Sequence, residues 1–231
     1  MQPFHFQQFS VKQTQEVFRV GTDALLLGAL VTPREGTILE VGTGTGIVSL
    51  MLAQRIHNAE ITAIDIQRES VELAAQNFAE SLFADRLTAK QADFKVYNSE
   101  SKFDLIVSNP PYFAKNNSVK DVMARQTVAL DFNILVARSA ELLNEQGCFS
   151  VIIPNVECEH FISLAGKCGL KLRRQVNIYG IAGGVVRRVI LEFAKQAGPV
   201  TQEVFTIEKS PRQYSDQYLE LTREFHVFSK K

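Results

Sequence analysis

Residues 38–46, Ile-Leu-Glu-Val-Gly-Thr-Gly-Thr-Gly, decide the fold, because a short apolar strand runs directly into a glycine-rich loop. A helical pattern follows over residues 47–55, so the loop joins a strand to a helix. Glycine lets such a loop turn tightly and lets a ligand approach the backbone without meeting a Cβ atom. We therefore predict a ligand-binding strand–loop–helix unit at the start of an α/β core.

The alternation of strand and helix continues along the chain. Further strands are predicted at residues 61–65, 87–92, 103–108 and 148–153, and helices at residues 69–84, 131–143 and 158–168. The last two strand candidates, residues 171–178 and 188–193, have no clear helix between them, and three glycines favour a hairpin turn there. We predict an α/β fold with a doubly wound, mostly parallel seven-stranded sheet, helices on both faces and an antiparallel last strand pair.

Capping residues mark the ends of two predicted helices. Asp131 is expected to cap the helix that follows it and Gly147 to end that helix. Residues 1–35 precede the first core strand, and within them Thr22 could cap a helix that runs to Leu30. We predict a single domain, in which residues 1–35 form an N-terminal extension and residues 36–231 the α/β core.

Charge is unevenly distributed in a chain whose totals balance at 25 basic and 25 acidic residues. From Lys167 onward there are twelve basic and six acidic residues, a net charge of +6, and the first 166 residues carry −6. This asymmetry is compatible with an anionic partner at the C-terminal third, or with a solvated face of a neutral protein.

Several classes of protein are disfavoured. The three cysteines form no C-x-x-C pair and the four histidines lack metal-ligand spacing, so we expect neither a disulfide framework nor a metal. The N-terminus lacks the pattern of a signal peptide, and no apolar run reaches the ~18 residues of a membrane span. We expect a cytoplasmic protein with no membrane partner, and no obligate protein partner is evident.

The glycine loop favours S-adenosylmethionine over a dinucleotide. Gly42, Gly44 and Gly46 lack the wider last spacing of the dinucleotide fingerprint, and no Gly-Lys-Ser/Thr ending marks a phosphate-binding P-loop. Glu40 stands just before the loop, where an anion would repel a pyrophosphate and suit the cationic ammonium and sulfonium of S-adenosylmethionine. We therefore predict that the chain binds this cofactor and releases S-adenosylhomocysteine.

Two acids follow the loop at the ends of later strands. Asp65 ends the second strand and can accept both ribose hydroxyls, and Asp93 ends the third strand candidate and can accept the adenine amino group. Each acid alone could be a helix cap or a loop carboxylate, but their order after this loop favours a ligand site. Ile66 and Phe94, the residues that follow them, complete this part of the candidate cofactor site.

Asn109-Pro110-Pro111-Tyr112 ends the fourth strand. Pro-Pro could simply terminate a strand, but the motif resembles the Asn-Pro-Pro-aromatic signature of class I methyltransferases that act on amino groups. An amino nitrogen on a planar ring or amide shares its lone pair with the π-system. Asn109 Oδ1 and the Pro110 carbonyl can accept its two hydrogens and localise that lone pair, while Tyr112 stacks on the flat face.

Sequence at both ends of the chain points to one family among the methyltransferases that act on amino groups. Residues 9–13, 18–29, 187–193 and 218–225, together with Asn-Pro-Pro-Tyr-Phe and a later Ala124-Arg125, resemble the tRNA1(Val) (adenine-N(6))-methyltransferase family. The resemblance implies methylation of the exocyclic amine of the adenine 3′ of the anticodon in a valine tRNA. It also implies that Thr22 and Asp23 lie near the methionine end of the cofactor, although a helix-capping pair would read the same way. The loop at residues 114–118 departs from the family pattern.

A tRNA substrate would use basic side chains to contact phosphates. The candidates are Lys115, Arg125, Arg173, Arg174, Arg187 and Arg188. Other readings remain open: a glutamine amide of a release factor, DNA adenine, or a non-catalytic protein that binds RNA or a dinucleotide. Release-factor enzymes usually carry a separate N-terminal helical domain and DNA enzymes a target-recognition domain, and this chain has little room for either.

Overall fold

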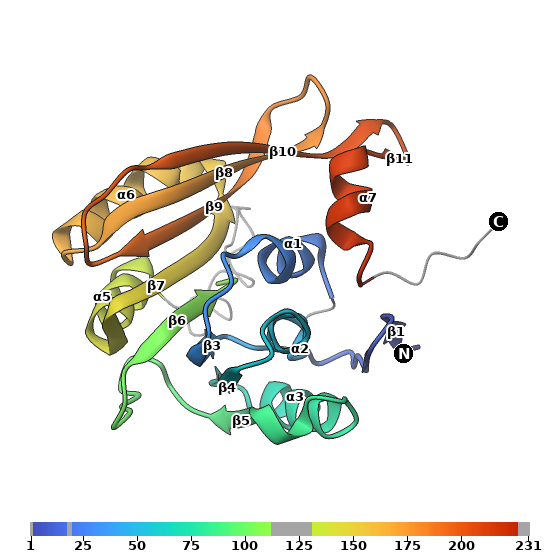
Figure 1. Cartoon of the computed structure of the whole chain (residues 1–231). Helices are drawn as coiled ribbons and strands as arrows, with labels where there is room; N and C mark the ends of the chain where they lie inside the picture. Colours follow the sequence, from blue (N-terminus) through green and yellow to red (C-terminus); the bar gives the residue numbers. More distant parts are fainter. Residues whose placement is uncertain (1, 18–19, 112–130, 226–231) are drawn as a thin grey trace, which may run out of the picture.

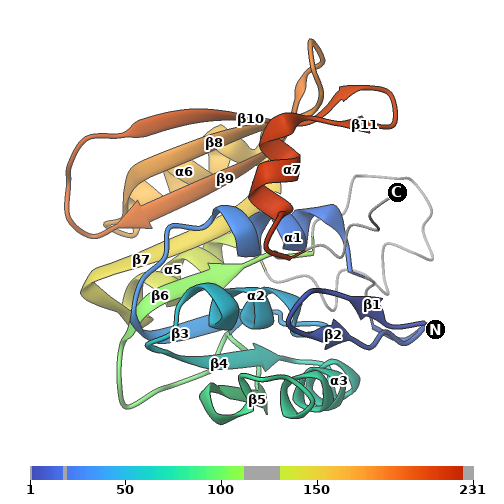
Figure 2. The same cartoon turned by 45° about the vertical axis from the view of Figure 1, so that its right-hand side comes forward.

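A nine-stranded sheet forms the centre of the molecule in a computed structural model that describes residues 2–17, 20–111 and 131–225 (Figures 1 and 2). Its strand order is β11-β10-β8-β9-β7-β6-β3-β4-β5. Five strands run parallel to one another: β3 (Gly36–Val41), β4 (Ala59–Asp65), β5 (Leu87–Gln91), β6 (Phe103–Ser108) and β7 (Leu143–Pro154). The predicted antiparallel pair is confirmed as β8 (Lys171–Ile181) and β9 (Val186–Ala194), with β9 also antiparallel to β7.

Two strands beyond the seven that we predicted extend the sheet past β8. β10 (Thr201–Ser210) pairs with β8 in parallel, and β11 (Gln213–Tyr214) pairs with β10. Five of the ten residues of β10 are exposed and only Phe205 is buried, so this strand lacks the apolar pattern of a core strand. Helix α7 (Asp216–Thr222) follows and packs against β10 and α1.

Helices cover both faces of the sheet, as predicted. One face carries α1 (Thr22–Leu30), α2 (Ile47–Arg55) and α3 (Arg68–Ala79), and the other carries α5 (Phe132–Leu142) and α6 (Cys158–Lys167). Successive residues of β3 serve the two faces, since Ile38 lies in the core under α2 and Leu39 in the core under α5 and α6. No helix within the described ranges is long and apolar enough to cross a bilayer.

The capping predictions have mixed outcomes. Asp131 is confirmed, since its side chain accepts from the Asn133 amide at 2.8 Å. Gly147 does not end the helix, because α5 stops at Leu142 and the chain enters β7 at once; Gly147 lies inside β7, where a Cβ would stand 2.8 Å from the carbonyl oxygen of Phe103. Thr22 is the first residue of α1, and Gly21 holds the N-cap position without any side-chain hydrogen bond.

The N-terminal extension packs into the core of the sheet. β1 (Phe4–His5) and β2 (Ser10–Val11) form a small hairpin, and Phe6, Phe9 and Val11 are buried in the cluster that contains α1 and α2. Gln7 donates its backbone amide to the carbonyl of Phe225 at 2.9 Å and its side-chain amide to the carbonyl of Arg223 at 2.6 Å. The N-terminal and C-terminal segments are therefore joined directly.

Of the glycines in the loop, Gly46 is the one whose surroundings leave the least room for a side chain. It lies at the N-cap of α2 with φ +80°, and a Cβ there would stand 2.5 Å from Cε1 of Phe78 on α3. We expect Gly46→Ala to lower the free energy of unfolding by about 3 kcal/mol, from the left-handed backbone and the clash together. Urea unfolding measures this change.

Gly42→Ala is the matched control for this prediction. Gly42 has a similar φ of +78°, but among the residues that the structure describes no atom beyond its own chain neighbours lies within 4 Å of a Cβ built on it. The free energy of unfolding of Gly42→Ala should fall by only about 1–2 kcal/mol, the contribution of the left-handed backbone alone. Equal losses in the two variants would show that the contact with Phe78 carries no energy.

Candidate active site

A cavity of about 530 Å³ opens at the carboxyl ends of β3, β4 and β6. Parallel sheets bind ligands at this edge. Of the ten residues predicted to bind the cofactor, nine line the cavity: Thr22, Asp23, Glu40, Gly42, Gly44, Asp65, Ile66, Asp93 and Phe94. The exception is Gly46, which is turned toward Phe78 and forms no part of the wall.

Glu40 is buried at the base of the glycine loop. Its Oε2 accepts from Thr43 Oγ1 at 2.8 Å, from the Ser49 amide at 3.2 Å and from the Ser49 hydroxyl. Burial raises the pKa of this carboxyl to about 7, although the three hydrogen bonds oppose the shift. All three bonds go to Oε2, and they fix the carboxyl in place at the wall of the cavity.

Asp65 ends β4 and holds the loop from the other side. Its Oδ2 accepts from the Gly44 amide at 3.0 Å and its Oδ1 from the Gln67 amide at 3.0 Å. Desolvation raises the pKa of Asp65, and bonds from backbone amides and Ser70 oppose the rise. The carboxylate therefore orders the glycine loop while it faces the cavity.

Apolar surface and a third carboxylate complete the far wall. Ile66 is 46% exposed, an unusual state for a large aliphatic side chain, and Phe94, which lines the same cavity, is 4% exposed. Asp93 accepts from the Lys95 amide at 2.9 Å through Oδ1. These three residues can hold a flat heterocycle between apolar surfaces with a polar edge.

Helix α1 forms the near wall. Asp23, in its first turn, pairs with Arg188 of β9 at 2.9 Å, and Thr22 and Gly21 line the cavity beside it. Arg188, which we predicted as an RNA contact, thus also fixes the start of α1 against the sheet.

Asn109 and Pro110 follow directly on β6 and line the same cavity. The preceding Ser108 is buried and donates to the carbonyl of Val41 at 2.9 Å, which ties the end of β6 to the end of β3. The strand that carries the Asn-Pro-Pro motif is thereby held beside the glycine loop. Tyr112 lies outside the described residues.

The described wall of the cavity carries a strong excess of negative charge. Asp23, Asp65 and Asp93 line it, and Glu40, with its pKa of about 7, adds part of a fourth negative charge, against Lys95 as the basic side chain. This balance disfavours a pyrophosphate and favours a cationic ligand with hydroxyl groups.

Comparison with known proteins identifies the family. Residues 9–165 match the model of the methyltransferase small domain. A tRNA1(Val) (adenine(37)-N6)-methyltransferase of Flavobacteriaceae bacterium strain 3519-10 is 48% identical over 99% of this chain and 100% of its own length. The chain belongs to the tRNA1(Val) (adenine(37)-N6)-methyltransferase family. Members from Phocaeicola vulgatus and Vibrio campbellii are 42% and 40% identical, each over at least 95% of both chains.

Solved structures confirm the class I methyltransferase fold. A predicted O-methyltransferase of Agrobacterium tumefaciens has a TM-score of 0.69 over 88% of this chain and 96% of its own, at 18% identity. The glycopeptide N-methyltransferase MtfA with bound S-adenosylmethionine has a TM-score of 0.57 over 76% of this chain and 93% of its own, at 14% identity. The family resemblance read from the sequence and the fold class are both confirmed.

The arginines proposed for RNA separate into two groups in this member of the tRNA1(Val) methyltransferase family. Arg187 and Arg188 stand at the start of β9, beside the cavity edge of the sheet. Arg173 and Arg174 stand near the start of β8, next to the end of α1 that is remote from the cavity. Lys115 and Arg125 lie outside the described residues.

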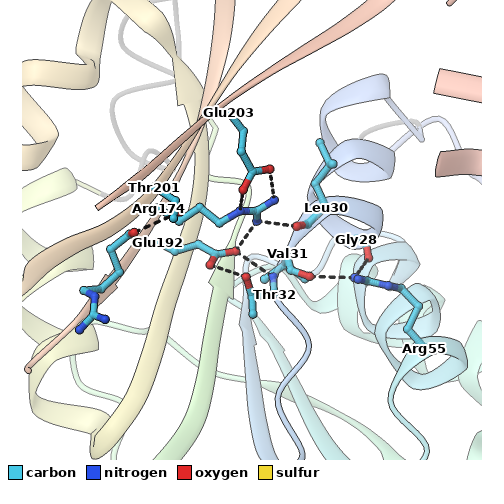
Figure 3. A network of polar contacts seen from close by, with 10 residues as sticks. Gly28, Leu30, Val31, Thr32, Arg55, Arg174, Glu192, Thr201 and Glu203 are labelled. Atoms are coloured by element: carbon cyan, nitrogen blue, oxygen red, sulfur yellow. Dashed lines mark hydrogen bonds and ion pairs between the residues drawn. The ribbon is translucent and has the colours of Figure 1, made fainter. Parts of the chain in front are cut away.

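Arg174 has a structural role that disfavours a phosphate contact (Figure 3). Its guanidinium makes two bonds to Glu203, at 2.7 and 2.8 Å, one to Glu192 at 2.9 Å and one to the carbonyl of Leu30 at 2.7 Å. Glu192 is buried and also accepts from the Thr32 amide and hydroxyl. Because two carboxylates neutralise Arg174, its charge serves to attach α1 to the sheet.

Sequence reasoning missed the hydroxyl groups that hold the acids. Thr43 and Ser49 bond Glu40, and Ser70 bonds Asp65. Thr43 stands within the glycine loop, three residues after Glu40, so its proximity to Glu40 could have been predicted from the sequence. Ser49 and Ser70 are in the first turns of α2 and α3, and helical spacing alone gives no signal for their partners.

Glu40 should make stability depend on pH. A folded-state pKa of about 7 lies above the ordinary value of 4.5, so the folded protein binds this proton more tightly than the unfolded chain. The stabilisation is complete below about pH 4.5 and is lost as the pH rises through 7. We expect the free energy of unfolding of the wild type, measured against Glu40→Gln, to fall by about 2–3 kcal/mol from pH 5 to pH 8. Parallel pH profiles of the two proteins would contradict the raised pKa.

Proposed function

We propose that the chain transfers a methyl group from S-adenosylmethionine to the exocyclic amine of an adenine in tRNA, the adenine 3′ of the anticodon in a valine tRNA. The observation that carries this proposal is the opening of Asn109 and Pro110 into the acid-lined cavity. Membership of the family and the methyl-transfer names of its relatives agree with it.

The cavity carries the charges and polar groups that S-adenosylmethionine requires. Glu40, Asp23 and Thr22 would hold the methionine end, where the ligand carries its ammonium. Asp65 would accept the ribose hydroxyls. Asp93 would accept the adenine amino group, with Ile66 and Phe94 on the two faces of the ring. When bound, the donor supplies an electrophilic methyl group on a cationic sulfur.

Asn109 and Pro110 would prepare the acceptor nitrogen. The Asn109 side-chain oxygen and the Pro110 carbonyl each accept one hydrogen of the amine, which favours a tetrahedral nitrogen with a localised lone pair. Tyr112 would stack on the base and fix its orientation. No strong general base is required, because the methylated nitrogen is acidic until it releases its proton to water.

The RNA side of the proposal rests on charge at the cavity edge. The target adenine must leave its stack to reach Asn109. Arg187 and Arg188 lie at the same edge of the sheet, and Lys115 and Arg125 follow the Asn-Pro-Pro-Tyr motif in sequence. These side chains would contact phosphates, and RNA binding should weaken as salt rises.

Incubation with a tritiated methyl donor tests the function. The purified chain is offered total tRNA, total protein and DNA in parallel, and calorimetry compares S-adenosylmethionine with NAD. We expect label in tRNA as N6-methyladenine at one position and binding of S-adenosylmethionine alone. Label in a glutamine side chain of a protein, or binding of NAD alone, would overturn the proposal.

A further inference from the structure

A second cavity of about 410 Å³ lies beside the first and shares Thr22 and Asp23 with it. It is bounded by the carboxyl ends of β8 and β10, the start of β9, β11 and α7. In Figure 2, β11 and α7 lie on the right-hand side, toward which the arrows of β4 and β6 point. The C-terminal strands that extend the sheet therefore build a new wall at the edge where the methyl donor is proposed to bind.

An aromatic pair forms one side of this second cavity. The rings of Tyr214 and Tyr218 stack with centroids 4.5 Å apart and planes 20° apart. Tyr218 is buried at 4% exposure, whereas Tyr214 is 48% exposed. One face of the Tyr214 ring is thus covered and rigidly backed, and the exposed ring is available to a further flat group.

A cationic side chain, that of Arg187, lines the second cavity together with the aromatic pair. Arg187 is exposed, its aliphatic stem lies over Gly180, and it forms no ion pair with any residue in the described ranges. In the turn between β10 and β11, the amide of Arg212 donates to Glu208 Oε2 at 3.2 Å and holds the carboxylate of this cavity-lining residue.

We propose that this second cavity binds a nucleotide of the RNA that adjoins the methylated adenine, with its base on Tyr214 and its phosphate on Arg187. The inference rests on the proposed function. An aromatic ring with an adjacent guanidinium is the usual means of holding an unstacked nucleotide. Because the two cavities share a wall, consecutive nucleotides can enter both when the target adenine is extruded.

Steady-state kinetics with tRNA test this subsite. Tyr214→Leu and Arg187→Gln should each raise KM for tRNA about five- to thirty-fold, the loss of one stacked base or one phosphate contact. Arg187→Gln should also reduce the salt dependence of KM by about one phosphate. Tyr214→Phe keeps the ring and should lose less than Tyr214→Leu. Affinity for S-adenosylmethionine, measured by calorimetry, should stay at the wild-type value in all variants.

Lys171→Gln is the matched charge control. Lys171 is exposed at the opposite end of β8. If only contacts to phosphates near the cavity contribute to tRNA binding, its removal should leave KM for tRNA within about two-fold of wild type. Unchanged KM in Tyr214→Leu and Arg187→Gln would overturn the subsite and leave the proposed function intact. A parallel loss of S-adenosylmethionine affinity would also overturn it, because the cavity would then act on the donor. A wild-type protein that methylates no tRNA would overturn both proposals.

Discussion

Asn109→Ala should lower kcat by about 10²- to 10³-fold and leave the affinity for S-adenosylmethionine close to wild type. Asn109 directly follows β6 and lines the cavity, whereas the donor is proposed to contact the glycine loop, Asp65 and Asp93. The lost interaction is one that strengthens in the transition state, as the amine becomes tetrahedral, so the effect falls on kcat. Single-turnover methylation of tRNA and calorimetry with the donor measure the two quantities.

Asn109→Asp is the informative companion to this variant. It keeps an acceptor oxygen at the same position, so it should retain more turnover than Asn109→Ala. Tyr112→Ala should act differently and mainly raise KM for RNA, since Tyr112 is proposed to position the base. Near wild-type kcat in Asn109→Ala, together with an unchanged KM for RNA in Tyr112→Ala, would refute the assignment of the motif.

Arg174→Met should lower the free energy of unfolding by about 3–5 kcal/mol. The substitution leaves the buried carboxylate of Glu192 without its cation and detaches Arg174 from the carbonyl of Leu30 at the end of α1. Urea unfolding measures the loss. Arg68→Met provides the comparison at the surface, because Arg68 and Glu72 form an exposed ion pair on α3. The urea midpoint of this variant should stay close to that of the wild type.

A double variant separates the charge from the packing. Adding Glu192→Gln to Arg174→Met removes the unpaired buried carboxylate and should recover part of the lost stability. Strictly additive losses would show that Arg174 and Glu192 do not interact, in contradiction to the 2.9 Å ion pair between them.

β3, β4, β6, β7 and β9 were predictable because each buries a run of apolar side chains. β10 was not, because Phe205 is its one buried residue and backbone hydrogen bonds to β8 carry its pairing. The end of α5 was also misread: Gly147 serves close packing against Phe103 inside β7, and its role as a helix stop cannot be distinguished from this in sequence.

The site residues were predictable where the order of the strands alone determines which side chains lie close together. Glu40, Asp65, Asp93 and Asn109 each stand near the carboxyl end of a parallel strand, so the fold brings them to one edge. The roles of Gly46 and Arg174 depend instead on contacts with residues distant in sequence. Phe78 stands 32 positions beyond Gly46, and the acids of Arg174 lie 18 and 29 positions away on neighbouring strands, so neither relation is local in sequence.

The junction between the two ends of the chain has a kinetic consequence. Gln7 bonds Arg223 across 216 residues, and the segment after it leads through Val17 toward Gly44 and the first wall of the donor cavity. Contacts so distant in sequence form late in folding. A nascent chain can assemble β3 to β7 while it is still being synthesised, and Lys12 can already pair with Asn77 of α3 at that stage. The bonds of Gln7 close only once residue 225 has left the ribosome, so the joining of the two chain ends should follow formation of the core as a separate and slower phase.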